Sequence, residues 1–309
     1  MTPRTQLVAA ARETIAKGSQ SFAAASTLFA PATRERAWLL YAWCRAADDL
    51  TDGQELGHGA APTRAASAVQ AHLEALTAAA LDGCGEVPLP FAALREVARE
   101  TAMPRRFIED HLAGFALDAA DWRPQNTDDL LRYCYHVAGT VGCMMAVVMG
   151  VSPKDDDTLD RACDLGLAFQ LANIARDVVP DAKIGRCYLP AEWLAHEGLG
   201  EAQLADPAQR AAVARMAQRL VAMGAGYRRS ARVGAARLPF RSRLAVLAAD
   251  GIYGAIGEKV VALGPRAWDE RVRISGAGKL GLAGRAALRS FGSGGEAPRA
   301  GLWTRARQP

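Results

Sequence analysis

This 309-residue chain has few aromatic residues and lacks zinc-binding cysteine motifs and nucleic-acid-binding motifs. Aromatic residues make up only 6% of it, and long stretches lack the alternation of a β-strand, which favours an all-α protein. The six cysteines form no C-x-x-C pair and have no zinc-site spacing with the five histidines, so we expect most of them to be reduced core residues. The net charge of +4 comes without a DNA- or RNA-binding motif, so no nucleic-acid partner is expected.

Long apolar runs are also missing. The N-terminus lacks the apolar core of a signal peptide. The longest apolar run, residues 141–151, contains Gly142 and Gly150 and is too short to span a bilayer as a helix. We therefore expect a cytoplasmic protein, at most peripheral on the inner membrane.

Acidic residues nearly disappear at the end of the chain. Beyond Arg271, only Glu296 opposes a series of basic residues interleaved with glycines: Arg273, Lys279, Arg285, Arg289, Arg299, Arg305 and Arg307. This composition predicts a poorly ordered basic tail over residues 274–309, following a single catalytic domain over residues 1–273. Such a tail is either a solvated terminus or a segment attracted to an anionic membrane surface.

Two pairs of aspartates stand out among the residues that are present. Asp48 and Asp52 lie in YAWCRAADDLTDG, and Asp177 and Asp181 lie in FQLANIARDVVPDA, both in apolar surroundings. Residues four apart on a helix lie one turn above each other, about 6 Å along the axis, so each pair can direct its oxygens to one place. Burying such carboxylates costs several kcal/mol unless cations compensate, and hard oxygen ligands suit magnesium. The pairs predict a shared magnesium site.

The first pair continues a polar stripe. Tyr41, Arg45, Asp48 and Asp52 are spaced by four, three and four residues, which places them on one face of a helix expected to begin near an N-cap at Thr33. The rest of this helix is largely apolar. A buried helix of this kind directs its polar stripe into a cavity.

A second stripe repeats the pattern with Gln170, Asn173, Asp177 and Asp181, spaced by three, four and four residues. Pro180 removes one backbone donor and disfavours helical geometry before it, so we expect the helix to kink or end beside Asp181.

Small residues interrupt the apolar segment from Tyr133 to Gly150. Ala138, Gly139, Thr140 and Gly142 predict either close helix packing or space for a long hydrocarbon substrate.

The quoted aspartate motifs, together with SQSFAAASTLFAPATR, YCYHVAGTVG, CYLPAEW and GPRAWDERV, occur in the order found in one enzyme family. The chain resembles the squalene/phytoene synthase family over nearly its whole length, and in particular its bacterial phytoene-synthase branch. The resemblance implies the isoprenoid-synthase fold, a bundle of antiparallel helices around a deep central cavity.

The resemblance also implies roles for individual residues. It assigns catalysis to the two polar stripes through Tyr41, Arg45, Asp48, Asp52, Asp177 and Asp181. It assigns magnesium, with manganese as a substitute, to Asp48, Asp52, Asn173, Asp177 and Asp181. It assigns substrate binding to Ser19, Ser21, Phe22, Tyr133, Gln170, Asn173, Arg176, Tyr253 and Arg271.

The implied activity is head-to-head condensation of two geranylgeranyl diphosphates, through prephytoene diphosphate, to phytoene in carotenoid biosynthesis. The last step, which gives phytoene, needs no NADPH, and the sequence has no G-x-G-x-x-G dinucleotide-binding motif. Two alternatives remain: a squalene or dehydrosqualene synthase acting on farnesyl diphosphate, and a non-catalytic assembly protein of the same fold. Retention of all four aspartates argues against the second alternative. A calcium-binding module is disfavoured because no EF-hand spacing occurs.

Overall fold

A computed structural model describes residues 2–52, 66–292 and 295–307. The described residues contain helices and no strand, which confirms the all-α prediction. The chain divides into two compact units, Met1–Ala120 with Met144–Asp155, and Asp121–Cys143 with Asp156–Pro309. Each unit is described by itself.

The first unit is built around α3, the helix of the first aspartate pair. Its helices are α1 (Arg4–Gly18), α2 (Gln20–Ser26), α3 (Pro31–Asp52), α4 (Ala66–Leu81), α5 (Leu89–Thr101) and α6 (Arg105–Ala119). α3 contacts α1, α4, α5 and α6, and its Leu39, Leu40 and Trp43 are buried. The helix begins at Pro31, earlier than the expected cap at Thr33, because proline has the backbone angle of a first helical residue and needs no N–H partner there.

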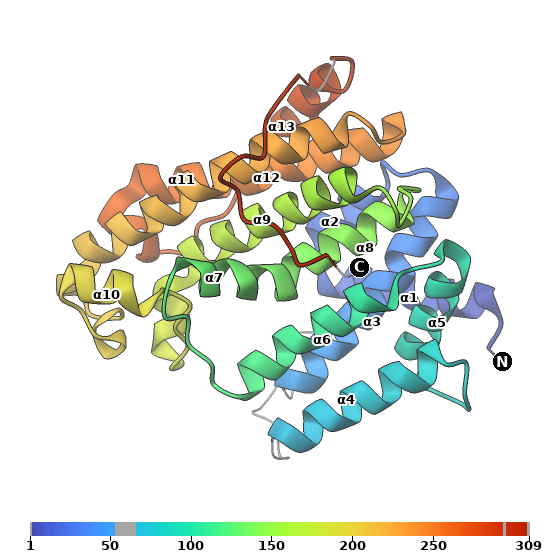
Figure 1. Cartoon of the computed structure of the whole chain (residues 1–309). Helices are drawn as coiled ribbons and strands as arrows, with labels where there is room; N and C mark the ends of the chain where they lie inside the picture. Colours follow the sequence, from blue (N-terminus) through green and yellow to red (C-terminus); the bar gives the residue numbers. More distant parts are fainter. Residues whose placement is uncertain (1, 53–65, 293–294, 308–309) are drawn as a thin grey trace. The chain divides into compact units, whose positions relative to one another are not determined.

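The second unit is built around α9, which carries the second aspartate pair (Figure 1). Its main elements are α7 (Thr127–Cys134), a π-helical turn η1 (Tyr135–Gly139), α9 (Asp156–Lys183), α10 (Ala191–Glu197), α11 (Arg210–Ala235), α12 (Phe240–Leu263) and α13 (Gly276–Arg289). Three short turns complete it: η2 (Glu201–Gln203), η3 (Pro207–Gln209) and η4 (Gly264–Trp268). α11 packs along α9, α12 contacts both, and α13 lies against α12. Helix α8 (Thr140–Val148) continues from η1 and begins within this unit.

The small-residue patch is explained by close packing of η1 and α8 on α9. A Cβ on Gly139 would lie 2.8 Å from Leu167 Cδ1, and one on Gly142 would lie 3.0 Å from the carbonyl carbon of Ala162. From the other side, a Cβ on Gly166 would lie 2.7 Å from Gly139 Cα. Of the two explanations, the structure supports close packing at these glycines.

Helix α9 does not end at Pro180. It continues through the proline to Lys183, so of the expected kink or end beside Asp181 the end is wrong and the kink stays a prediction. Only one turn follows Pro180, and the preceding part of α9 is held by its packing on α11 and α12, which outweighs the loss of one backbone hydrogen bond.

The segment after Arg273 contains regular structure in place of the poorly ordered tail that its composition indicates. Helix α13 covers Gly276–Arg289, and residues 297–307 run along α9, where their arginines form ion pairs. The domain boundary after Arg273 stays a prediction. Across the described parts of the chain, no helix combines the length and apolarity needed to cross a membrane.

Candidate active site

The first polar stripe is organised around Arg45. Its guanidinium donates to Asp49 Oδ1 over 3.0 Å from Nε and 2.6 Å from Nη2, and Nη2 lies 3.0 Å from Asp48 Oδ2. The Asp48 side chain is 47% exposed, whereas that of Asp49 is 15% exposed. Asp49, which the sequence interpretation left out, therefore holds Arg45 in place while Asp48 faces outward. Asp52 ends α3, and its side chain lies outside the described residues.

Tyr41 joins this group from one turn earlier. Burial raises the pKa of its hydroxyl, and the positive charge of Arg45 opposes that rise. The Phe22 ring lies 5.5 Å from the Tyr41 ring, and a Cβ on Gly18 would lie 2.6 Å from the Tyr41 oxygen, so a glycine leaves room for that hydroxyl. Ser19 Oγ accepts a hydrogen bond from the Phe22 N–H over 3.3 Å. The structure thus brings four predicted residues together at the junction of α1, α2 and α3.

Ser21 was also assigned to this region. It belongs to α2, but its side chain lies outside the described residues.

The second polar stripe is flanked by arginines. Arg176 donates from Nε to Asp177 Oδ1 over 2.9 Å, and Arg271 Nη2 lies 3.4 Å from Asp177 Oδ2. One turn on, burial and the negative charge of Asp177 raise the pKa of Asp181 to about 6, although Arg186, Arg176 and Arg271 oppose this. Burial and the neighbouring negative charge therefore both disfavour the ionised form of Asp181.

The remaining predicted residues of α9 lie toward its middle. Asn173 Nδ2 donates to Gln170 Oε1 over 3.5 Å, so the two amides are oriented by each other. Both are half-buried, and an amide has further donors and acceptors besides this one bond.

Two aromatic stacks place the predicted tyrosines of this unit. The Tyr133 ring is buried between Trp122, 5.9 Å away, and Tyr188, 4.9 Å away. Tyr253 stacks on Phe169 with the ring centres 3.9 Å apart. Burial raises the pKa of Tyr253 and the charge of Arg176 opposes it. Trp122 and Phe169 were missed from the sequence because an isolated aromatic residue in an apolar segment has no pattern that separates it from the core.

Tyr188 also lines a small pocket beside the second pair. The pocket is bounded by Ile174, Val178, Asp181, Arg186 and Tyr188, among others. A carboxylate, a guanidinium and a phenol therefore meet at one apolar cleft in this unit.

The shared magnesium site is not tested by the described side chains. Where the structure describes side chains, no three His, Cys, Asp or Glu residues are grouped so that they could hold a metal ion. The two stripes belong to separate compact units. Magnesium binding therefore stays a prediction.

Comparison with known proteins identifies the family. The squalene/phytoene synthase family matches residues 15–277. The chain belongs to this family. Among squalene/phytoene synthases, it is 52% identical over 267 residues to a 15-cis-phytoene synthase of Enterobacter agglomerans, covering 86% of this chain and 90% of the relative. It is 48% identical over 309 residues to the 15-cis-phytoene synthase of a Paracoccus strain, covering 97% and 98%.

The fold agrees with that membership. A crystal structure of a dehydrosqualene synthase in complex with ligand matches with a TM-score of 0.81 at 26% identity, covering 93% of this chain and 98% of that one. The predicted isoprenoid-synthase helical fold is thereby confirmed.

Proposed function

We propose that this chain is a prenyltransferase that condenses two geranylgeranyl diphosphates to 15-cis-phytoene, as an enzyme of carotenoid biosynthesis. The observation that supports this most is identity of about 50%, over most of the chain, to enzymes named 15-cis-phytoene synthase. The retained aspartate pairs favour a catalytic protein over a non-catalytic assembly protein of the same fold. The second candidate is a synthase that condenses farnesyl diphosphate, because the structure of a dehydrosqualene synthase has the same fold.

Magnesium, or manganese in its place, fits the donors available. Carboxylate and amide oxygens of Asp48, Asp52, Asn173, Asp177 and Asp181 would hold it, and a bound cation would favour the ionised form of Asp181, which burial and the charge of Asp177 disfavour. When bound, magnesium supplies charge that stabilises a departing diphosphate.

The arginines of both stripes would bind diphosphate oxygens. Arg45 and Arg176 each donate a hydrogen bond to a carboxylate of their own helix, and Arg271, which lies outside α9, donates to Asp177. Each guanidinium offers five N–H donors, so it can contact an anionic substrate while keeping its carboxylate partner. These contacts would orient the substrate and favour departure of its diphosphate.

The reaction balances without a reductant. Ionisation of one allylic diphosphate leaves a cation that the double bond of the second molecule attacks, and loss of a proton closes the cyclopropane of prephytoene diphosphate. Departure of the second diphosphate, rearrangement and loss of another proton then give phytoene. No electrons are added from outside, so NADPH is not required.

The test is a product assay on the purified full chain. Geranylgeranyl diphosphate and farnesyl diphosphate are supplied separately with magnesium, with and without NADPH, and the hydrocarbon is identified by mass spectrometry. We expect phytoene from the C20 substrate without NADPH. A C30 product formed efficiently from farnesyl diphosphate, with none from geranylgeranyl diphosphate, would contradict the proposal.

We also propose peripheral contact with an anionic membrane through α13. Leu280 and Leu288 of α13 are 76% and 77% exposed, and Phe291, two residues beyond the end of the helix, is 79% exposed. Phe240 of α12 adds a ring 5.2 Å from that of Phe291. Between Glu270 and Glu296 the sequence is basic without an acidic residue, so the charge suits an anionic surface.

Such contact would serve an enzyme whose product is an insoluble C40 hydrocarbon. Its test is co-sedimentation with phosphatidylglycerol vesicles, using Leu288→Glu with Phe291→Glu, and Leu89→Glu as the control at another exposed leucine. We expect the double variant to lose at least about tenfold in vesicle affinity, since each buried Leu or Phe contributes about 1.5–3 kcal/mol. Equal binding of the double variant and the control would reject this surface.

A further inference from the structure

The first half of α9 bears a row of three acids, two of them buried, that the proposed reaction does not use. Asp156, Asp160 and Asp164 are spaced by four residues and therefore follow one face of the helix. Asp160 and Asp164 are only 1% and 0% exposed. The helix dipole favours negative charge only in the first turn, so it assists Asp156 but not the other two. Buried carboxylates so close together require cations from elsewhere in the chain.

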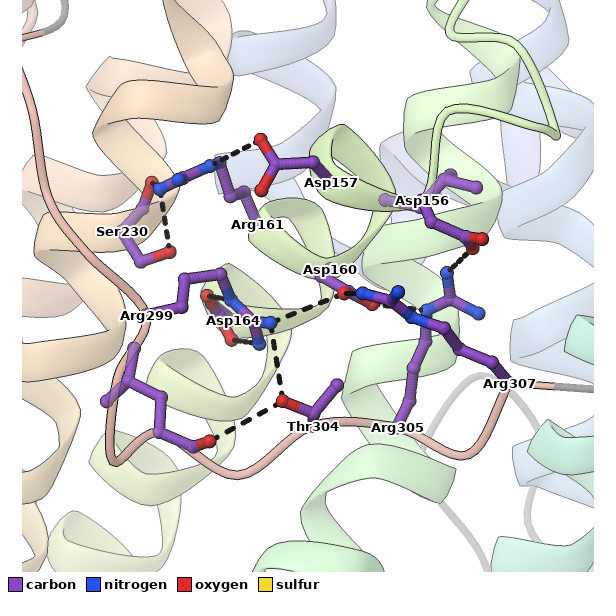
Figure 2. Close-up of polar contacts among 12 residues, drawn as sticks. Asp156, Asp157, Asp160, Arg161, Asp164, Ser230, Arg299, Thr304, Arg305 and Arg307 are labelled. Atoms are coloured by element: carbon purple, nitrogen blue, oxygen red, sulfur yellow. Dashed lines mark hydrogen bonds and ion pairs between the residues drawn. The ribbon is translucent and has the colours of Figure 1, made fainter.

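The cations come from the C-terminal segment, as Figure 2 shows. Arg299 donates to both oxygens of Asp164, from Nε and Nη2, over 2.8 Å each, which is the bidentate geometry that a guanidinium and a carboxylate favour. Arg305 is itself buried, forms an ion pair with Asp156, and places Nε 2.8 Å from Asp160 Oδ1 at an angle outside hydrogen-bond geometry. We call residues 297–307 the C-terminal strap.

A third arginine and a polar residue complete the cluster. Arg307 Nη2 lies 2.5 Å from Asp160 Oδ2, and Arg299 Nη1 lies 3.3 Å from the same oxygen. Arg299 Nη1 also donates to Thr304 Oγ1 over 3.4 Å, within the strap itself. Arg299 therefore contacts another residue of the strap as well as the aspartates of α9.

Backbone and aromatic contacts fix the strap on three elements. Arg161 of α9 donates to the carbonyl oxygen of Ala297 over 3.1 Å. The Trp303 N–H donates to the hydroxyl oxygen of Tyr227, on α11, over 3.3 Å, and the Trp303 ring lies 5.5 Å from that of Tyr135 in η1. The strap thus bridges α9, α11 and η1.

Candidate site residues lie on or beside two of these elements. Asp177 lies on α9, thirteen residues beyond Asp164, and Tyr133 lies in the last turn of α7, two residues before Tyr135 of η1. The acidic row lies inside residues 15–277, which the family matches, whereas the strap lies beyond them. The strap therefore adds to the family core a structure that reaches both elements.

We propose that the C-terminal strap is a detachable ionic clasp that positions α9 and η1. Docked, its arginines neutralise the acidic row and its tryptophan holds the π-helical turn. Undocked, it leaves the chain folded but lets residues 135–139 and 156–167 open more often, which misplaces Tyr133 and Asp177 for turnover. The effect on turnover rests on the proposed function, whereas the effect on local opening does not.

Hydrogen–deuterium exchange on the full chain tests the clasp without any assay of activity. Arg299→Ala removes the bidentate contact, Arg299→Lys keeps the charge but not the fork, and Arg289→Ala removes an exposed arginine of α13 as the control. We expect Arg299→Ala to speed exchange in residues 135–139 and 156–167 at least about tenfold, with a smaller increase for Arg299→Lys and none for the control. Unchanged exchange in Arg299→Ala would overturn the proposal.

Addition of the segment in trans tests whether the strap is detachable. A chain ending at Glu296 is mixed with a synthetic peptide of residues 295–309, or with the same peptide carrying glutamine in place of its three strap arginines. We expect only the native peptide to restore protection, in a saturable way that weakens in about 1 M NaCl. If the truncated chain loses protection everywhere and the peptide does not restore it, the segment is part of the core and the clasp is wrong.

Turnover of geranylgeranyl diphosphate separates positioning from stability. We expect Arg299→Ala to lower kcat with little change in KM, and the native peptide to restore kcat to the truncated chain. Lost protection with unaltered kcat would reject positioning. A wild-type chain that shows the exchange effect but makes no phytoene would refute the proposed function and leave the clasp intact.

Discussion

The close approach of α9 to η1 predicts that Gly166→Ala destabilises the protein. A Cβ at this position would lie 2.6 Å from the carbonyl carbon of Ala138 and 2.7 Å from Gly139 Cα, and closer still to the Ala138 oxygen. All three neighbours are backbone atoms, so no side chain can rotate away to make room. The two elements would have to separate.

The magnitude follows from two opposing effects. Alanine is favoured over glycine inside a helix by about 1 kcal/mol, which alone would make the variant more stable. Overpacking costs about 1–3 kcal/mol, and rigid backbone neighbours place this site toward the upper end. We therefore expect a net loss of about 1–2 kcal/mol in the free energy of unfolding.

Urea unfolding followed by circular dichroism measures this difference. Gly281→Ala in α13 is the matched control, because it has the same helical setting but no atom within 4 Å of the added Cβ, and it should be as stable as the wild type or up to about 1 kcal/mol more stable. If Gly166→Ala matched Gly281→Ala, the close packing of α9 on η1 would be refuted.

Two further predictions concern individual carboxylates. Asp177→Asn should lower kcat/KM for geranylgeranyl diphosphate at least about 100-fold, because under the proposed function it removes a charge from the pair that would hold the metal beside the departing diphosphate. Asp128→Asn, at an exposed site on α7, should leave kcat/KM unchanged, and a steady-state assay at saturating magnesium measures both. Burial disfavours ionisation of Glu100, but hydrogen bonds from Arg4 and Arg36 outweigh it and lower its pKa from the ordinary 4.5 to about 2. Its contribution to the free energy of unfolding, about 1–2 kcal/mol after solvent screening, should be complete above about pH 4.5 and lost as the pH falls toward 2. Urea unfolding at pH 6 and pH 3 should show a stability difference between wild type and Glu100→Gln that is smaller at pH 3. A difference that stays constant would contradict the assignment.

The helices of both polar stripes could be predicted from the sequence because their signal is local. Tyr41, Arg45 and Asp48 follow the helical period on α3, and Gln170, Asn173 and Asp177 follow it on α9, so spacing alone places each set on one face. The end of α9 could not be predicted in the same way. Tertiary packing decides whether a helix continues through a proline, and that packing comes from α11 and α12, which lie far along the chain.

The C-terminal strap had no local signal at all. Arg299 and Asp164 are 135 residues apart, and the arginines of the strap follow neither a helical nor a strand period. A glycine-rich basic composition fits a solvated tail equally well, because composition does not record that an acidic row on another helix needs those charges. Which residue pairs with a buried charge depends on the three-dimensional fold and cannot be read from local sequence.

The acidic row also changes what the aspartate spacing means. The sequence contains Asp160 and Asp164 at the same interval as Asp177 and Asp181, on the same helix. In the first case one arginine occupies both oxygens of Asp164, so the carboxylate has its counter-charge from within the chain. In the second case burial and the negative charge of Asp177 raise the pKa of Asp181 to about 6, and burial also raises the pKa of Asp164 even with Arg299 beside it, so the two pairs differ in their contacts and not in the direction of the pKa shift. A spacing of four residues therefore indicates only that two carboxylates lie on one face of a helix. Whether such a pair binds arginines of the same chain or is a candidate metal site depends on the groups that surround it.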